Sequence, residues 1–339
     1  MLGRYMHEIR WNPLIKQWII VAPHRAVRPW RPDEKESFPC PFCPGAPELK
    51  DLKSWNVVVL PNKYPALLPN PTPAPKPDFP LYKVLDARGV SEVVIETPDH
   101  EGDLHTLSLK HVWEVVKAYR EEYEKLSKLN YVEYIAIFRN KGKEVGVSLT
   151  HPHSQIYALP FIPPKIEAEI EVFQDYWNKL FKCVLCDILE YELTCKSRLV
   201  YENSVFTILL PYYAMWPYEL HVYVKKHVRS INELSDEDLK FLADSLRVVT
   251  ATYNALLDRD APYIMVLHNH PSKGDYPYHF HVEFYQPYRD RDKLKYAAGI
   301  EWGYWTFTYD GVPEERVKEL RSACRESVKK LGDVLGYCF

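Results

Sequence analysis

The sequence of 339 residues repeats itself once, and this duplication limits the folds that are open to it. Each half contains, in the same order, a C-x-x-C pair, a strand-like run that leads to a histidine, an amphipathic helix pattern and a closing His-x-His segment. The histidine and the closing segment are 51 residues apart in the first half and 52 in the second. The landmarks are Cys40, Cys43, His100 and His151, then Cys183, Cys186, His227 and His279. Such agreement predicts a duplicated α+β module.

Each module is expected to combine short strands with one long helix. Apolar residues from Leu109 to Leu126 recur every three or four positions, which indicates an amphipathic helix within about residues 108–129. In the second half, Ser235 followed by Asp238 is typical of a helix N-cap. The boundary is expected between about residues 160 and 182, which gives an N-terminal module of residues 1–165 and a C-terminal module of residues 166–339.

Charge and hydropathy exclude two classes of function. Lys and Arg number 43 against 46 Asp and Glu, a net charge of -3, so the chain lacks the basic field with which nucleic-acid-binding proteins collect phosphates. No apolar run approaches the roughly 18 residues that span a bilayer, and the first eight residues lack the apolar core of a signal peptide. We therefore expect a cytoplasmic protein with no nucleic-acid partner and no membrane partner.

The cysteine and histidine landmarks of the two halves predict metal sites. Two thiolates at C-x-x-C spacing chelate from one turn, and two distant imidazoles complete a tetrahedral Cys2His2 shell suited to zinc. Three alternatives remain open: a redox pair, thiols packed as small apolar residues, and His105 in place of His100 as a ligand. Cys195, Cys324 and Cys338 lie outside both sets, and both buried thiols and a disulfide remain open for them.

The closing segment of the first half, from His151 to Tyr157, predicts a strand that presents reactive groups. Residues i, i+2 and i+4 of a strand share one face, so His151, His153 and Gln155 line up. If a metal holds His151, then His153 can offer a neutral imidazole nitrogen as a nucleophile. Gln155 can donate its amide to a phosphoryl oxygen. The alternative is a polar strip on a strand that faces solvent.

These residues resemble the galactose-1-phosphate uridylyltransferase family, whose members are duplicated histidine-triad proteins. The resemblance covers nearly the whole chain and implies an α+β fold of two tandem histidine-triad-like modules that form one large, mainly antiparallel sheet with packed helices. Its most specific part is the stretch Asn140-Lys141-Gly142, Gly146, Ser148 and His151-Pro152-His153-Ser154-Gln155. Supporting matches are Asn12-Pro13-Leu14, Gln17-Trp18-Ile19, Pro23 to Trp30, Trp216 to Glu219 and Phe284 to Pro287.

The resemblance also implies a double-displacement reaction. His153 would attack the α-phosphorus of UDP-glucose, release glucose 1-phosphate, hold a covalent uridylyl group and pass it to galactose 1-phosphate. It implies His153 and Gln155 as catalytic residues, and a homodimer that takes a UDP-sugar and a sugar 1-phosphate. Zn²⁺ is expected in both Cys2His2 sets. The implied substrate contacts are Arg25, Arg28, Asn62, Asn140, Gly146, Ser148, Lys295 and Glu301.

Two departures from the family pattern bear on the substrate. Lys63 stands where many members carry an acidic residue near the ribose, and residues 303–308 stand where those members carry a glutamine beyond the sugar-binding segment. This tail and the complete second ligand set are closer to the ADP-glucose phosphorylases of the same superfamily, which pass AMP from the same histidine to phosphate. Some family members bind iron through positions that align with Glu169, His268, His281 and Glu283. Iron is the less favoured metal, because Glu283 replaces a histidine.

Two other classes of function compete with a transferase. Hydrolytic histidine-triad relatives carry a histidine at the third position of the motif, whereas this chain has Gln155 and Glu283. Glutamine cannot protonate a leaving group, so hydrolysis of a histidine adduct is disfavoured. A zinc-stabilised module that binds nucleic acid or protein is disfavoured because neither half carries a basic run.

Overall fold

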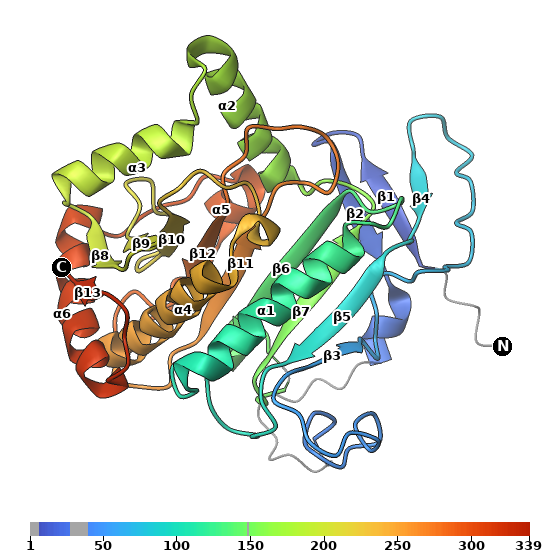
Figure 1. Cartoon of the computed structure of the whole chain (residues 1–339). Coiled ribbons are helices and arrows are strands. Elements are labelled where there is room, and N and C mark those ends of the chain that lie inside the picture. Colours follow the sequence, from blue (N-terminus) through green and yellow to red (C-terminus); the bar gives the residue numbers. More distant parts are fainter. Residues whose placement is uncertain (1–6, 28–39, 148) are drawn as a thin grey trace.

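The computed structural model describes residues 7–27, 40–147 and 149–339, so two predicted substrate contacts, Arg28 and Ser148, lie outside the described residues. The described part contains one 10-stranded antiparallel sheet with helices packed against it (Figure 1). This arrangement confirms the predicted α+β class. In sheet order the strands are β13 (Tyr337–Cys338), β8 (Leu199–Glu202), β9 (Phe206–Leu209), β10 (Leu220–Val224), β12 (His281–Tyr285), β11 (Tyr263–His268), β6 (Tyr134–Lys141), β7 (His153–Leu159), β5 (Val90–Ile95) and β3 (Val58–Pro61).

A smaller three-stranded sheet and several helices complete the described chain. The small sheet has the order β2 (Gln17–Val21), β1 (Glu8–Asn12) and β4 (Val84–Asp86). The α-helices are α1 (Leu109–Leu126), α2 (Pro164–Leu180), α3 (Val184–Cys195), α4 (Asp236–Leu257), α5 (Gly299–Tyr304) and α6 (Pro313–Leu331). Short 3-10 turns lie at η1 (Pro23–Val27), η2 (Lys143–Val145) and η3 (Ile231–Glu233). Among the described residues, no helix is both long and apolar enough to cross a membrane.

The large sheet repeats one strand order on both sides of a central contact. From the centre outward, the order is β6-β7-β5-β3 in the first half and β11-β12-β10-β9 in the second. In each half the strand after the long helix pairs with the closing strand, which in turn pairs with the strand before the helix. The halves join where β6 runs antiparallel to β11, with Asn140 opposite Ile264. The topology therefore displays the duplication, while the boundary at residue 165 stays a prediction.

The long helices begin at residues that the sequence marks as caps. The Ser108 side chain caps α1, and Ser235 and Asp238 form a capping box at the start of α4. The buried face of α1 is the predicted apolar face within Leu109–Leu126. Helices α1 and α4 lie side by side on one face of the large sheet, with α6 beside α4 (Figure 1). Burial of these apolar faces forms the main core.

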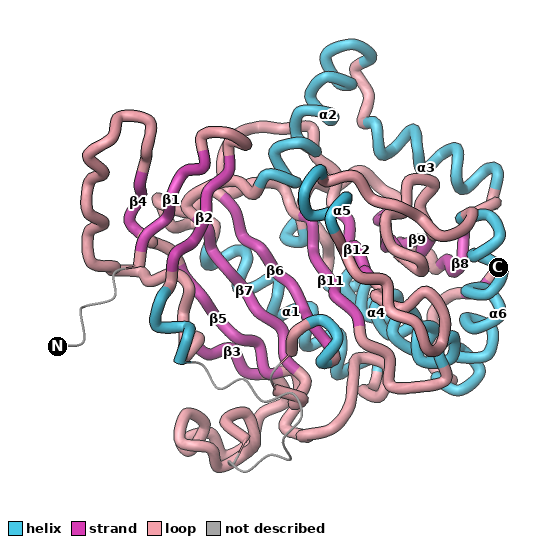
Figure 2. Tube along the Cα trace, turned by 180° about the vertical axis from the view of Figure 1, so that it is seen from behind, coloured by secondary structure: helices cyan, strands magenta, loops and turns pink. Residues whose placement is uncertain are grey.

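Strand alternation decides which side chains of β7 face the helices. Ile156 and Ala158 belong to the core beneath α1. Neighbouring residues of a strand point to opposite faces, so His153, Gln155 and Tyr157 project from the other side. Figure 2 shows this other side, with β5, β6 and β7 lying in front of α1. The predicted reactive face is therefore turned away from the main core.

A disulfide joins Cys324 in α6 to Cys338 in β13, with the two Cα atoms 6.0 Å apart. Cys195 is instead an exposed free thiol. The bridge spans 14 residues, and closing a loop of about this length stabilises a fold by about 3 kcal/mol. We expect Cys338→Ser to lower the free energy of unfolding by about this amount relative to Cys195→Ser, measured by urea denaturation without reductant. Equal stability of the two variants would contradict the assignment.

Candidate functional site

A pocket of about 170 Å³, open to solvent, lies on the face of the large sheet opposite α1. Side chains of β6 and β7 form its floor, and η1 and the turn after β6 form its rim. It is lined by Arg25, Phe138, Asn140, Gly146, Val147, His153, Gln155 and Tyr157. The fold thus brings together Arg25, Asn140, Gly146, His153 and Gln155, five residues that were proposed for the site from the sequence. Their individual roles stay predictions.

His153 is the first residue of β7 and is only 8% exposed. Its Nδ1 lies 2.8 Å from the carbonyl oxygen of His151. A carbonyl oxygen can only accept a hydrogen bond, so Nδ1 carries the proton and Nε2 of the neutral ring carries the lone pair. The Phe42 ring lies 5.2 Å, between centroids, from the His153 ring. These contacts fix the tautomer and restrict rotation of the imidazole.

The turn after β6 depends on two glycines. Gly142 has φ of +95° and Gly146 has φ of +81°, both in the region that side chains disfavour. A Cβ atom on Gly142 would also lie 2.4 Å from the Cβ of Pro262. The turn begins after β6, which ends one residue beyond Asn140, and it places Gly146 in the pocket lining. The glycines therefore shape the rim.

Arg25 reaches the pocket from η1 and is held by a partner on β7. Its guanidinium NH1 donates to the Tyr157 hydroxyl at 2.6 Å. Tyr157 lies two residues beyond Gln155, so the two side chains share a face of the strand. A guanidinium oriented in this way can bind a phosphoryl oxygen. The pocket therefore combines a cation, amide groups and an imidazole.

The first cysteine and histidine set converges beside His153. Sγ of Cys40 lies 3.6 Å from Nδ1 of His151, and Sγ of Cys43 lies 3.3 Å from Nδ1 of His100. All four ligand atoms lie within 4.8 Å of one another. Nε2 of His151 is directed at the carbonyl oxygen of Thr97, at 2.8 Å, the kind of outer contact that metal-binding histidines make. The donor set fits a tetrahedral metal ion such as zinc.

The second set repeats this geometry. Sγ of Cys183 lies 3.6 Å and Sγ of Cys186 lies 3.5 Å from Nδ1 of His279. Nδ1 of His227 lies 3.5 Å from Sγ of Cys186, and the four ligand atoms again lie within 4.8 Å of one another. Nε2 of His279 is directed at the carbonyl oxygen of Val224, at 2.9 Å. Both predicted groups are therefore assembled, and each could hold a metal ion.

The structure groups His100, and not the alternative His105, with Cys40, Cys43 and His151. His105 lies in the loop before α1, where its Nε2 is 3.2 Å from Nδ2 of Asn254 and its Nδ1 is 3.5 Å from Asp103. The group that could hold a metal contains His100 instead. Sequence spacing alone could not separate two histidines five residues apart in an irregular segment.

A third group gathers on the second half of the sheet and on α2. The side chains of Glu169, His268, His281 and Glu283 offer ligand atoms within 4.8 Å of one another. Burial opposes charge on His268, but Glu169 and Glu283 outweigh it and raise the pKa of His268 to about 9. Lys165 also forms an ion pair with Glu283. The four residues could hold a metal ion, and Lys165 already places a positive charge beside one of the two carboxylates.

Three proposed substrate contacts lie outside the pocket lining. Asn62 follows β3 and accepts a hydrogen bond from a nearby backbone N–H at 2.9 Å. Lys295 is buried and donates from Nζ to the Met215 carbonyl at 2.8 Å. Glu301 in α5 accepts from the Thr308 hydroxyl at 2.9 Å. Contact of these residues with a substrate stays a prediction.

Several residues at the pocket were not predicted as site residues from the sequence. Tyr157 had a signal, because it continues the face that holds His153 and Gln155. Phe138 could have been found in the same way, since it lies two residues before Asn140 on β6. Phe42 is not part of the lining but contacts His153, and it had no such signal, because this contact depends on how the C-x-x-C loop packs against the strand.

The fold and the pocket define a class of duplicated α+β proteins in which one histidine lies beside an arginine and amide groups. Family models for galactose-1-phosphate uridyl transferase match the chain in two parts, the N-terminal domain over residues 2–163 and the C-terminal domain over residues 169–299. The chain therefore belongs to the galactose-1-phosphate uridylyltransferase family.

Individual relatives agree with this placement. A galactose-1-phosphate uridylyltransferase from Thermotoga maritima is 41% identical over 319 residues, which cover 93% of this chain and 98% of the relative. A solved uridylyltransferase structure superposes with a TM-score of 0.86 at 42% identity and covers 94% of this chain and 99% of that chain. An ADP-glucose phosphorylase from Arabidopsis thaliana with bound ADP-glucose gives a TM-score of 0.71 at 26% identity, covering 93% and 98%.

Proposed function

We propose that the protein transfers UMP from UDP-glucose to galactose 1-phosphate, giving UDP-galactose and glucose 1-phosphate through a covalent intermediate on His153. One observation carries the proposal: the hydrogen bond from Nδ1 of His153 to the His151 carbonyl leaves the lone pair on Nε2 in a pocket with Arg25, Asn140 and Gln155. Family membership and the T. maritima relative support the same reaction.

In the first half-reaction, Nε2 of His153 attacks the α-phosphorus of UDP-glucose. A bond forms between nitrogen and phosphorus, and the bond from that phosphorus to the bridging oxygen breaks. Glucose 1-phosphate leaves with the electron pair. The ring then carries positive charge, which the His151 carbonyl stabilises through Nδ1–H. Arg25, Asn140 and Gln155 are positioned to balance charge on the phosphoryl oxygens.

In the second half-reaction, a phosphate oxygen of galactose 1-phosphate attacks the same phosphorus. The bond from nitrogen to phosphorus breaks, and its electron pair returns to Nε2 of His153. No proton has to move, because both the leaving group and the attacking group are phosphate oxygens. Gln155 cannot act as an acid or base for water, so transfer to a sugar phosphate is favoured over hydrolysis.

The cysteine and histidine groups are proposed to hold zinc, two ions per chain. When bound, zinc would lock the His151 ring and thereby the backbone carbonyl that orients His153, without taking part in the chemistry. Iron in the third group is the less favoured assignment, because Glu283 stands where a histidine is expected and already forms an ion pair with Lys165. A homodimer and a cytoplasmic location remain part of the proposal.

Adenylyl transfer from ADP-glucose to phosphate is the second candidate. It is favoured by the structural likeness to the Arabidopsis phosphorylase with bound ADP-glucose. A screen of half-reactions separates the two. Each donor, UDP-glucose or ADP-glucose, is offered alone, and then galactose 1-phosphate or phosphate is added. The proposal expects a UDP-glucose adduct that is cleared by galactose 1-phosphate, and an ADP-glucose adduct cleared by phosphate would overturn it.

Tyr157 is expected to hold Arg25 ready for the substrate phosphate. Tyr157→Phe removes the 2.6 Å hydrogen bond to the guanidinium and leaves the ring in place. We expect KM for UDP-glucose to rise by about tenfold, the equivalent of one charge-assisted hydrogen bond. The matched control is Tyr337→Phe, which removes a hydroxyl bonded to Glu202 at 2.8 Å in the C-terminal strand. Equal KM values for the two variants would contradict the role of Tyr157.

A further inference from the structure

The strands that carry the pocket lose their regular pairing within the pocket. The β6–β7 ladder runs from Tyr134 opposite Leu159 to Phe138 opposite Gln155. Asn140 and His153 lie beyond its last pair, where β6 continues along β11 and β7 along β5. Backbone hydrogen bonds between β6 and β7 therefore do not set the separation of these two pocket residues.

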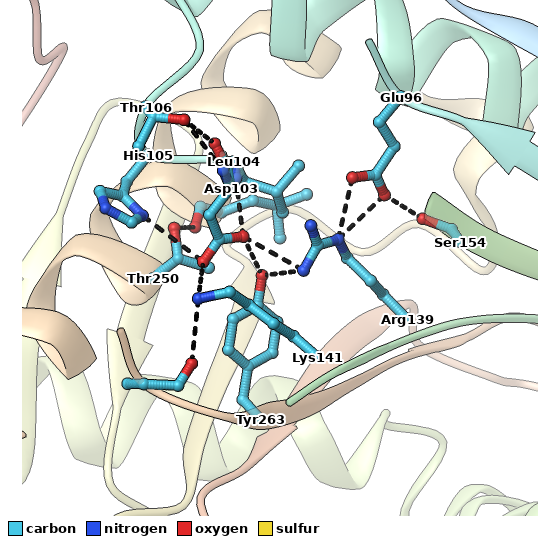
Figure 3. Close-up of polar contacts among 12 residues, drawn as sticks. Glu96, Asp103, Leu104, His105, Thr106, Arg139, Lys141, Ser154, Thr250 and Tyr263 are labelled. Atoms are coloured by element: carbon cyan, nitrogen blue, oxygen red, sulfur yellow. Dashed lines mark hydrogen bonds and ion pairs between the residues drawn. The ribbon is translucent and has the colours of Figure 1, made fainter. Parts of the chain in front are cut away.

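A buried ion pair connects the strands beyond the end of the β6–β7 ladder (Figure 3). Arg139 lies between Phe138 and Asn140 on the back of β6, and its Nε donates to both carboxylate oxygens of Glu96 at 3.0 and 2.9 Å. Glu96 follows β5 and accepts a short hydrogen bond from the hydroxyl of Ser154. Ser154 lies between His153 and Gln155 on β7. The three side chains therefore link the backs of the strands whose fronts form the pocket floor.

The same network extends to the second half of the chain. NH1 of Arg139 donates to the Tyr263 hydroxyl on β11 at 2.6 Å and lies 3.1 Å from Asp103. Burial alone would raise the pKa of the Asp103 carboxyl, but Arg139, His105 and Lys141 outweigh it and hold that pKa below its usual range. Arg139 thus sits between β11 and the β5–β7 pair.

Both members of the central ion pair are buried. The Arg139 side chain is 2% exposed and that of Glu96 is 0% exposed. A buried ion pair adds little net stability compared with apolar residues of the same size, because both charges are stripped of water. Its geometry is nevertheless rigid, since each charged group is satisfied from two or more elements. A rigid ion pair of this kind suits a site where two residues must be held at a fixed separation.

We propose that Glu96 and Arg139 are positioning residues that set the distance between Asn140 and His153. The proposal rests on the proposed function, because it assigns the pair to the transfer reaction. Glu96 also donates its backbone N–H to the Pro152 carbonyl at 3.1 Å, so the segment before His153 is tied to the same residue. Loss of the pair would let β6 and β7 separate at the pocket floor while leaving the nucleophile and the metal ligands in place.

The test replaces both partners at once, so that neither is left as an unpaired buried charge, and Asp103 keeps its ion pair with Lys141 at 3.1 Å. The double variant Glu96→Gln with Arg139→Met is compared with Glu192→Gln with Arg198→Met, a second buried pair with Nε 3.0 Å from the carboxylate, joined to α3. Stability and metal content are measured first, and kinetics are recorded at a temperature where both variants are fully folded. The rate constant for adduct formation with UDP-glucose and the KM are then determined.

We expect the Glu96 and Arg139 double variant to form the adduct about 10- to 100-fold more slowly, the effect of misplacing a reacting group by about 1 Å, with little change in KM. Ser154→Ala is expected to slow the step less, because Glu96 keeps Arg139. The Glu192 and Arg198 control should keep the wild-type rate. A wild-type rate in the first double variant, or equal losses in both, would overturn the positioning role. Failure of the wild-type protein to form any adduct would instead reject the proposed function.

Discussion

His153→Gly is expected to lower the rate of uridylyl transfer by on the order of 10⁴-fold or more, because it removes the only atom proposed to bond to phosphorus. The backbone at residue 153 pairs with Ile95 of β5 through main-chain groups, so the strand should persist without the imidazole. The measurement is the steady-state rate with UDP-glucose and galactose 1-phosphate, together with labelling of the protein by UDP-glucose whose α-phosphate is radioactive.

The location of the label provides an internal control. His281 has the same local geometry as His153, with Nδ1 3.0 Å from the carbonyl oxygen of His279. His281 is also surrounded by the third group of potential metal ligands. Peptide mapping should therefore find the label on the peptide that contains residue 153 and not on the one that contains residue 281. Undiminished labelling of His153→Gly would show that another residue is the nucleophile.

Cys43→Ser is expected to release one metal ion and to lower the free energy of unfolding by more than about 4 kcal/mol, because metal-binding energy is folding energy at such sites. Cys43 lies within reach of both His100 and His151. Activity should fall as well, because the His151 carbonyl holds the His153 ring. Metal analysis after dialysis, urea denaturation and the adduct assay measure the three effects.

Two cysteine variants serve as controls. Cys195→Ser changes an exposed thiol outside both groups and should retain two metal ions and full stability. Cys186→Ser should release one ion but slow adduct formation less than Cys43→Ser, because its group lies beside His281 and not beside His153. An unchanged metal content in Cys43→Ser would show that the first group does not hold a metal ion.

The sequence alone predicts those features that depend on the spacing of residues along the chain. The duplication placed both cysteine and histidine groups, because ligands from a turn, a strand end and a closing strand recur at matched intervals. The buried face of α1 followed from apolar residues at helical spacing within Leu109–Leu126. Strand alternation placed His153 and Gln155 on one face, and both line the pocket.

Features that depend on packing between distant segments could not be predicted. The sequence marks Glu96 and Arg139 only as charged residues near strand ends, and nothing in their spacing indicates that they meet in the core. The hydrogen bond from Arg25 to Tyr157 spans 132 residues. The pairing of Cys324 with Cys338 depends on how the last strand returns to α6. Lys295 and Glu301 were proposed from resemblance alone, and the pocket lining does not include them.

The mass of the intact protein after incubation with UDP-glucose alone tests the central claim most directly. The account predicts that the wild-type chain gains the mass of one uridylyl group, that glucose 1-phosphate appears in equal amount, and that galactose 1-phosphate returns the protein to its original mass while UDP-galactose forms. A wild-type protein that turns over the two substrates together, yet gains no mass with UDP-glucose alone, would contradict a covalent intermediate on His153.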